Sequence, residues 1–339
     1  MTRRYIFLVT VLFTTLTYSQ IGGRYTYQFL NLVSSPRQAA LGGKHVTGYN
    51  ADPTSAILNP ASINIEMDNQ LAVNYVNYIA DVNYGSVSYA KALGENKNVF
   101  HTGVTYINYG RFNGFDEFGN ETTDFGAGEV AISVGYSYAI PNSNFHVGAN
   151  GKFISSKLEE FTSLGGALDL GLIYHKPDSK FDFGFVIRNL GTQFTTYAGT
   201  QEDLPLSVDM GFANTLSNVP IRWNLTLENL QVWDVAFGNP ARDITDLEGN
   251  IDTDDPSFIN NALRHVVVGL EFFPDSGFNL RLGYNFRRSE ELRIVDQRSF
   301  AGISGGVSIK LGKFKFAYSF ARYNSAASTS TFGINVNLL

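Results

Sequence analysis

One property of this sequence limits its fold more than any other: apolar and polar residues alternate strictly in segment after segment. In residues 313–323, KFKFAYSFARY, aromatic residues occupy every second position from 314 to 320, and Lys, Ala and Ser lie between them. Side chains of an extended strand point to opposite faces in turn, so one face of this segment is aromatic and the other is polar. A soluble sheet buries such an apolar face, whereas a membrane barrel turns it toward lipid.

The same alternation recurs along most of the chain and predicts about fourteen strands. In residues 278–286, FNLRLGYNF, large apolar residues oppose Asn, Arg, Gly and Asn. Because the number of strands is even and their lengths suit tilted crossings, the sequence predicts an all-β fold, a transmembrane antiparallel β-barrel. The predicted strands cover residues 70–79, 82–93, 98–109, 127–139, 145–155, 165–175, 181–189, 206–214, 221–229, 265–273, 278–287, 299–310, 314–323 and 329–339.

The connections between these segments give an independent indication of the same fold. Outer-membrane barrels have short periplasmic turns and long outer loops, which alternate along the chain. A periplasmic β-sandwich or propeller is the alternative, but neither class sorts its connections in this way. The short connections are residues 94–97, 140–144, 176–180, 215–220, 274–277 and 311–313, and the longer ones between them include 110–126, 156–164, 190–205, 230–264 and 288–298.

Residues 1–19 are predicted to be a secretory signal peptide. Two arginines precede an apolar run of residues 5–16 and a cleavage site before Gln20. A membrane anchor is the alternative, but the run is too short for one. Removing the peptide takes away two positive charges, so the formal net charge moves from -6 to -8, which gives no attraction for nucleic acid. The chain contains no cysteine, so an exported domain needs another source of stability, such as a closed sheet.

Residues 20–69 lack the alternation and are predicted to form a plug, or hatch, inside a barrel made of residues 70–339. The segment contains NADPTSAILNPASI, in which Asp52, Asn59 and Pro60 are the predicted plug residues. Glycine and proline interrupt any regular element here. The alternative is a periplasmic extension that packs beneath the barrel.

The inward-facing positions of the predicted strands combine glycines with charges of both signs. They form either a polar conduit or a network of salt bridges that holds strands and plug together, and the close mixture of signs favours the network. The principal lumen charges are Asp209, Arg222, Glu271 and Arg281. Because directly opposed residues share a face, Glu271 is predicted to lie opposite Arg281, with Gly277 at positive φ in the intervening turn.

No catalytic, metal or cofactor site is predicted. The five histidines have no metal-ligand spacing, and the sequence contains no phosphate-binding loop. A membrane-embedded hydrolase would need Ser and His side by side on neighbouring strands, an arrangement that sequence spacing leaves open.

Partner binding is predicted in the long outer loops, since such loops carry recognition on a rigid scaffold. One loop contains the acidic run DITDLEGNIDTDDP, which is out of register for an EF-hand calcium loop. An exposed, solvated loop is the alternative reading of these acids. The candidate partner-binding residues are Asp243, Asp246, Asp252, Asp254, Asp255, Arg288, Arg293 and Arg298.

Several segments resemble the PorQ-like outer-membrane barrels of the type IX secretion system of Bacteroidota. These segments are YQFLNLVSSPRQAALGG, NADPTSAILNPASI, INYGRFNGFDEFGNETTDFGAGEVAISVGYSYAI, GKFISSKLEEFTSLGGALDLGLIY, and IRNLGTQF followed by LPLSVDMGF. The likeness covers nearly the whole mature chain. The pattern at Asp52, Ala56, Asn59, Pro60 and Ala61 is shared widely with FadL-like barrels, whereas YGRFNGFDEFG and KFISSKLEEF point more narrowly to the PorQ-like family.

The resemblance implies a non-enzymatic role without a cofactor. A barrel of this family is expected to hold the surface protein PorZ within an attachment complex with PorU and PorV, which joins secreted cargo to lipopolysaccharide. Two other functions are open: a PorV-like shuttle that binds the C-terminal signal domains of cargo, and a FadL-like transporter of hydrophobic small molecules. A transporter would need an apolar pocket, yet the predicted lumen is polar.

Overall fold

A computed structural model describes residues 25–94, 98–177, 179–236, 244–245, 251–252, 256–292, 300–323 and 327–339. Fourteen strands form one closed antiparallel barrel, in which β1 pairs with both β2 and β16 to complete the ring. This confirms the predicted fold class. The predicted signal peptide, residues 1–19, lies outside the described residues.

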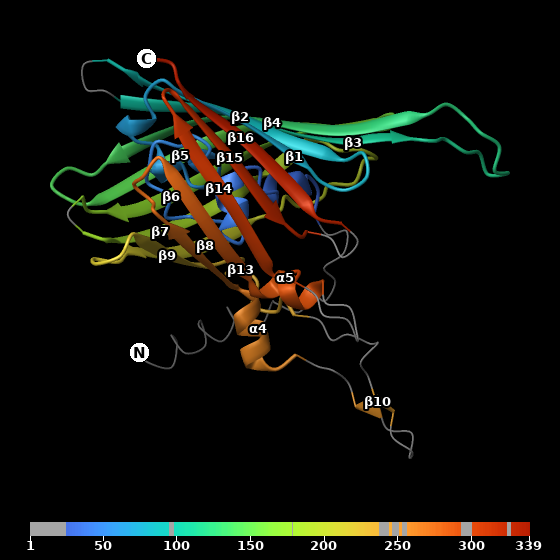
Figure 1. The fold of residues 1–339 in the computed structure, drawn as a ribbon. Helices are drawn as coiled ribbons and strands as arrows, with labels where there is room; N and C mark the ends of the chain where they lie inside the picture. Colours follow the sequence, from blue (N-terminus) through green and yellow to red (C-terminus); the bar gives the residue numbers. More distant parts are fainter. Residues whose placement is uncertain are drawn as a thin grey trace, which may run out of the picture.

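The barrel strands lie close to the predicted positions, because each apolar–polar alternation persists while the strand spans the wall (Figure 1). The largest differences are extensions at the ends that carry the longer connections. The strands are β1 (Gln70–Asn77), β2 (Asn83–Leu93), β3 (Asn98–Phe112), β4 (Phe125–Ala139), β5 (Phe145–Leu158), β6 (Phe161–His175), β7 (Phe181–Thr195), β8 (Ser207–Thr215), β9 (Ile221–Leu227), β12 (Val266–Phe272), β13 (Phe278–Asn285), β14 (Ile303–Leu311), β15 (Phe314–Ala321) and β16 (Thr329–Asn337).

The connections sort by length between the two ends of the barrel, which we call the turn end and the loop end. The turn end carries the short connections, such as residues 140–144 and 312–313. At the loop end one prediction is wrong: residues 156–164 are not a long loop, because β5 and β6 continue until only Glu159 and Glu160 separate them. Glu159 has φ 57°, which closes this tight hairpin.

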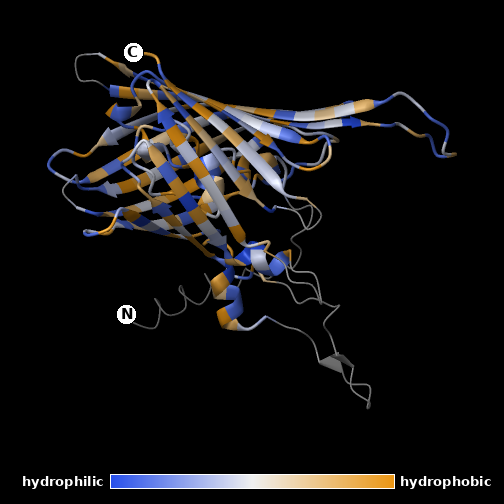
Figure 2. Cartoon of the chain, in the orientation of Figure 1, coloured by the Kyte–Doolittle hydropathy of each residue, from blue (hydrophilic) through white to orange (hydrophobic). Residues whose placement is uncertain are grey.

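The two faces of the wall differ as the alternation requires. In Figure 2, hydrophobic and hydrophilic positions alternate along each strand. The aromatic residues of β15, from Phe314 to Phe320, are all exposed on the outside, at 38% to 47% of their surface. Ser319 and Ala321, on the other face, are buried. The outer face is therefore the lipid-facing one.

Residues 25–69, here called the inner segment, pack against the inside of the wall. Figure 1 shows this blue segment surrounded by strands. Short helices and turns make up the segment, since its Gly and Pro residues prevent longer elements. They are η1 (Gln28–Asn31), α2 (Pro36–Ala40), α3 (Ser55–Leu58), η2 (Pro60–Ser62) and η3 (Ile65–Met67).

Inward-facing glycines let the inner segment lie directly on the wall. A side chain at Gly148 would collide with the backbone at Pro60 and Ala61, and one at Gly171 would collide with the Asn59 side chain. One at Gly283 would collide with the backbone at Gly42. An apolar core fills part of the remaining space, where Tyr27 and Phe29 of the inner segment pack with strand residues such as Ile154.

The loop end also carries helices α4 (Phe258–Arg264) and α5 (Phe286–Glu291) and the two-stranded sheet of β10 (Ile244–Thr245) and β11 (Ile251–Asp252). Within the described residues, every helix is too short or too polar to cross a bilayer.

The alternation of connections predicts which end faces the medium. An epitope inserted after Asn120, in the β3–β4 hairpin, is expected to bind antibody on intact cells, whereas one after Asn142, in the β4–β5 turn, is expected to bind only after the outer membrane is permeabilised. Flow cytometry of both variants measures this. Labelling of the Asn142 epitope on intact cells would show that the barrel is inverted.

Candidate functional site

Five charged residues inside the barrel form what we call the mid-barrel cluster: Lys44, Lys152, Asp169, Arg188 and Asp209. The carboxylate of Asp209 lies 3.2 Å from Lys44 Nζ and 3.2 Å from Arg188 Nη2. Lys152 Nζ lies 2.6 Å from Asp169 Oδ2. Every one of these side chains is at most 8% exposed. The cluster therefore joins the inner segment, through Lys44, to β5, β6, β7 and β8.

A β-bulge in β7 completes this cluster. The pairing of β6 with β7 shifts between Leu168 and Leu170, where Asn189 adopts φ 60°. As a result Asn189 faces inward beside Arg188, and its N–H donates to Asp169 Oδ1 at 2.8 Å. The side-chain Oδ1 of Asn189 accepts a hydrogen bond from Lys152 Nζ at 2.9 Å. Bulges commonly re-aim a side chain in this way.

A second group, the turn-end cluster, contains Arg37, Asp182, Arg222, Glu271 and Arg281. Glu271 accepts from Arg281 Nε at 2.7 Å and from Arg37 Nη2 at 2.8 Å. Arg222 pairs with Asp182, which also lies 2.7 Å from His175 Nδ1. Glu271 and Arg281 are each 2% exposed, so this pair is shielded from water.

The structure confirms the predicted register of this hairpin, because Glu271 lies directly opposite Arg281. The predicted turn conformation is wrong. Positive φ occurs at Phe273, at 56°, and not at Gly277. Asn279 Nδ2 donates to the Phe273 carbonyl and so stabilises this alternative turn.

The three residues predicted for the plug all lie within the inner segment and organise its turns. Asp52 Oδ1 accepts from Thr54 N–H at 3.0 Å. Asn59 Nδ2 donates to the Val46 carbonyl at 2.8 Å, and its Oδ1 accepts from Ala61 N–H at 3.1 Å. Pro60 lies against the glycines of β5 and β6. These contacts fix the path of the chain through the lumen.

Two cavities that border the inner segment are small, at about 20 and 30 Å³. Polar groups such as Lys44 and Arg188 line the first, and Arg37, Asp52 and Arg281 line the second. A pocket for a drug-sized ligand usually holds ~300 to 1,000 Å³ and is mostly apolar. Neither cavity therefore matches the apolar pocket that a transporter would need.

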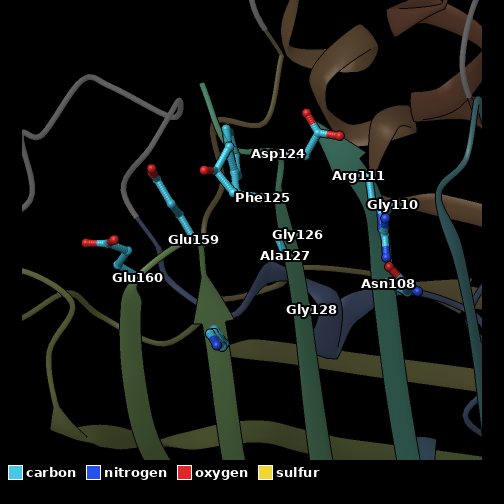
Figure 3. A pocket seen from close by; sticks show the side chains of 12 residues that line it. Asn108, Gly110, Arg111, Asp124, Phe125, Gly126, Ala127, Gly128, Glu159 and Glu160 are labelled. Atoms are coloured by element: carbon cyan, nitrogen blue, oxygen red, sulfur yellow. The ribbon is translucent and has the colours of Figure 1, made fainter. Parts of the chain in front are cut away.

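A groove lies at the loop end, on the β3–β4 hairpin, the adjoining end of β5 and the β5–β6 turn. It has a volume of about 760 Å³. Figure 3 shows Arg111 and Asp124 on one side of it and Glu159 and Glu160 on the other. The groove is open and lined by charges of both signs, which suits a protein surface more than a small apolar ligand.

The hairpin itself projects well beyond the rest of the barrel (Figure 1). Phe112 and Phe125 stack across it at a centroid distance of 5.4 Å. Beyond this pair, Phe115 is 57% exposed and Phe118 is 81% exposed. Exposed aromatic residues on a projecting element are typical of a binding surface.

The turn at the tip of this hairpin is ordered by Asp116. Its carboxylate accepts hydrogen bonds from the backbone N–H groups of Phe118 and Asn120 and from Asn120 Nδ2, at 2.8 to 2.9 Å. The side-chain hydrogen bond from Asn120 holds the pKa of Asp116 below its usual range. The tip therefore keeps its shape and its negative charge at neutral pH.

The predicted partner-binding residues are only partly described. Asp243, Asp246, Asp254, Asp255, Arg293 and Arg298 lie outside the described residues. The backbone of Asp252 lies in β11, paired with Ile244. Arg288 differs from expectation: its guanidinium donates to the Gly42 carbonyl at 2.8 Å and lies 4.2 Å from the centre of the Tyr323 ring. The Arg288 side chain therefore contacts the inner segment.

Several residues of these candidate sites were not predicted from the sequence. Arg37 and Lys44 lie in an irregular segment, where periodicity gives no facing direction. The inward direction of the Asn189 side chain could not be predicted, because a bulge locally reverses the alternation of side chains between the two faces. Phe115 and Phe118 could have been noticed as aromatic residues in the polar loop YGRFNGFDEFG. Among the described residues, no three His, Asp or Glu side chains lie close enough to hold a metal ion.

Comparisons with known proteins agree on the fold. No protein-family model matches the chain, and no curated protein matches it. The TodX monoaromatic hydrocarbon channel deltaS2 mutant has a TM-score of 0.52 and 15% identity, covering 91% of this chain and 98% of that one.

Two further solved structures are similar. The Ralstonia pickettii toluene transporter TbuX has a TM-score of 0.49 and 11% identity, covering 89% of this chain and 96% of its own. A Pseudomonas aeruginosa FadL homologue has a TM-score of 0.47 and 10% identity, covering 89% and 98%. At sequence identities this low, structural similarity establishes only the fold. That conclusion rests on the similarity to TodX. The chain is an outer-membrane β-barrel of fourteen antiparallel strands, and its fold is similar to that of the TodX channel.

Proposed function

We propose that this barrel is a non-enzymatic scaffold that holds a partner protein at the cell surface. The observation that carries the proposal is the projecting β3–β4 hairpin, which exposes Phe115 and Phe118 and also lines a groove of about 760 Å³. Interfaces are enriched in aromatic residues and Arg, and Arg111 lines this groove. The resemblance of the sequence to PorQ-like barrels supports a partner of the PorZ kind, within a complex with PorU and PorV at the lipopolysaccharide-bearing surface.

The contacts inside the barrel support a role in holding a partner protein rather than in letting a small molecule pass through the barrel. The inner segment is tied to the wall by the ion pairs of Lys44 with Asp209 and of Arg37 with Glu271. Each pair joins residues that are far apart in the sequence, and in each pair the carboxylate is buried. Such pairs are costly to break, so they favour a fixed interior. We infer that the inner segment acts as a plug and that the rigid barrel presents the outer surface.

Transport of a small hydrophobic molecule is the second candidate. The observation that favours it is the likeness in fold to TodX, which is described as a monoaromatic hydrocarbon channel. The comparisons favour this candidate, and the contacts inside the barrel favour the first. Passage would require the inner segment to move, because the cavities beside it measure only about 20 and 30 Å³.

Partner retention tests the first candidate. The double substitution Phe115→Ser and Phe118→Ser is expected to weaken retention of the surface partner about tenfold or more, because two exposed aromatic anchors are lost. The measurement is affinity purification of the barrel from outer membranes, with quantification of the co-purified protein. A cargo protein in place of a PorZ-like one would support the shuttle alternative.

A matched control separates binding from folding. Val219→Ser removes another exposed apolar side chain, 44% exposed, which lies in the β8–β9 turn at the turn end, away from the outer loops. It is expected to leave retention unchanged. The heat-dependent shift of the folded barrel on gels should be the same in all variants. Unchanged retention in the hairpin variant, together with uptake of monoaromatic hydrocarbons into vesicles containing the barrel, would favour transport instead.

A further inference from the structure

A small cavity near the turn end collects more positive than negative charge. It measures about 30 Å³ and lies between the inner segment and the strands β1, β13, β15 and β16. Arg37, Arg281 and Lys315 line it, with Asp52 as the single carboxylate in its lining. Glu271 lies nearby but is already shared between Arg37 and Arg281.

Lys315 is the unusual member of this group. Its ammonium makes no hydrogen bond or ion pair with any described residue, although its side chain faces the cavity. Asn335 lies directly opposite it on β16 and also lines the cavity. On its other side Lys315 is directly opposite Lys310 of β14. Two like charges at directly opposed positions destabilise a sheet unless something separates or neutralises them.

Arg37 adds a second unused donor. Its Nη2 pairs with Glu271, but its Nε is buried and has no hydrogen-bond partner among the described residues. A buried donor without a partner destabilises the folded state. The cavity thus has donors from Lys315 and Arg37 that need an acceptor.

The charge balance shows what kind of acceptor fits. The turn-end cluster together with Asp52 and Lys315 contains four cations, Arg37, Arg222, Arg281 and Lys315, and three carboxylates, Asp52, Asp182 and Glu271. The formal excess is one positive charge. One monovalent anion would neutralise it, whereas water would supply an acceptor without a charge.

We propose that this cavity binds one small monovalent anion of the halide class, held by Lys315 and Arg37. The volume of about 30 Å³ exceeds the roughly 10 to 15 Å³ that a cavity needs to hold one water molecule. A monatomic anion fits this space. Because Arg37 belongs to the inner segment and Lys315 to the wall, the anion would help to hold the two together. This inference does not depend on the proposed surface function.

Bromide is a suitable probe because it can be located by its anomalous scattering. Crystals of the purified barrel grown in bromide are expected to show one anomalous peak in the cavity, between Lys315 and Arg37. In crystals of the Lys315→Gln variant the peak is expected to disappear. Lys313→Gln, in the exposed β14–β15 turn, should retain it. Absence of the peak from the wild-type barrel, or peaks only at surface lysines, would overturn the proposal.

A solution measurement covers the case in which a variant does not crystallise. Replacing gluconate by chloride at constant ionic strength is expected to raise the Tm of the wild-type barrel by about 2 to 4 °C. The same exchange should leave the Tm of Lys315→Gln unchanged and should raise that of Lys313→Gln as in the wild type. An equal rise in all three proteins would assign the effect to general salt action and contradict a bound anion.

Discussion

Replacement of Asp209 by asparagine is expected to lower the free energy of unfolding by about 3 to 5 kcal/mol. Asp209 is completely buried, and both Lys44 and Arg188 lie 3.2 Å from its carboxylate. Asparagine has nearly the same shape, so packing is preserved while two buried cations lose their shared counter-charge. Urea-induced unfolding in detergent or lipid vesicles, followed by tryptophan fluorescence, would measure the loss.

Two further variants test whether charge is the cause. Asp234→Asn removes an exposed carboxylate at the loop end and is expected to change stability by less than about 0.5 kcal/mol. Adding Lys44→Met to the Asp209→Asn variant removes one of the two cations that lost their counter-charge, and it should recover part of the lost stability. If Asp209→Asn costs no more than Asp234→Asn, the mid-barrel cluster does not stabilise the fold.

Leu282→Arg is expected to destabilise the barrel by about 2 to 4 kcal/mol, because it places a charge on the lipid-facing surface near the middle of a strand. Leu282 is 45% exposed on the outer face of β13 and lies opposite Leu270 of β12. The guanidinium would have to leave water for hydrocarbon or bend away toward the interface. Refolding into vesicles over a urea titration gives the free energy.

Depth in the bilayer provides the control for this variant. Leu311 is also on the outer face, 57% exposed, but it is the last residue of β14 beside the short turn. Leu311→Arg is expected to cost only about 0 to 1 kcal/mol, since a charge near the interface can reach water. Equal costs at the two positions would show that the assigned lipid-facing belt is wrong.

Much of the barrel could be predicted from the sequence, because the rules for side-chain alternation and strand pairing are local. Side chains on a strand alternate with a period of two, so the faces of Phe314, Phe316 and Lys315 could be assigned without knowing their neighbours. The same parity gave the pairing of Glu271 with Arg281, because opposed residues must share a face. Turn conformation was less predictable, since the positive φ falls at Phe273, where a hydrogen bond from Asn279 stabilises it.

The candidate sites depended on contacts that no local pattern encodes. Lys44 and Asp209 are 165 residues apart in the sequence, and the inner segment that brings them together has no period to reveal its path. The bulge at Asn189 arises where β6 and β7 meet, so it interrupts an alternation that otherwise predicts facing correctly.

The sequence by itself determined the number of strands, their order along the chain and the face that meets lipid, because a closed antiparallel barrel repeats one local rule at every strand. Only the tertiary structure decided which cations of residues 25–69 meet which carboxylates of the wall, and how far the β3–β4 hairpin projects. These features depend on the balance between burying charge and pairing it across long sequence separations, which is set when the barrel closes around the inner segment.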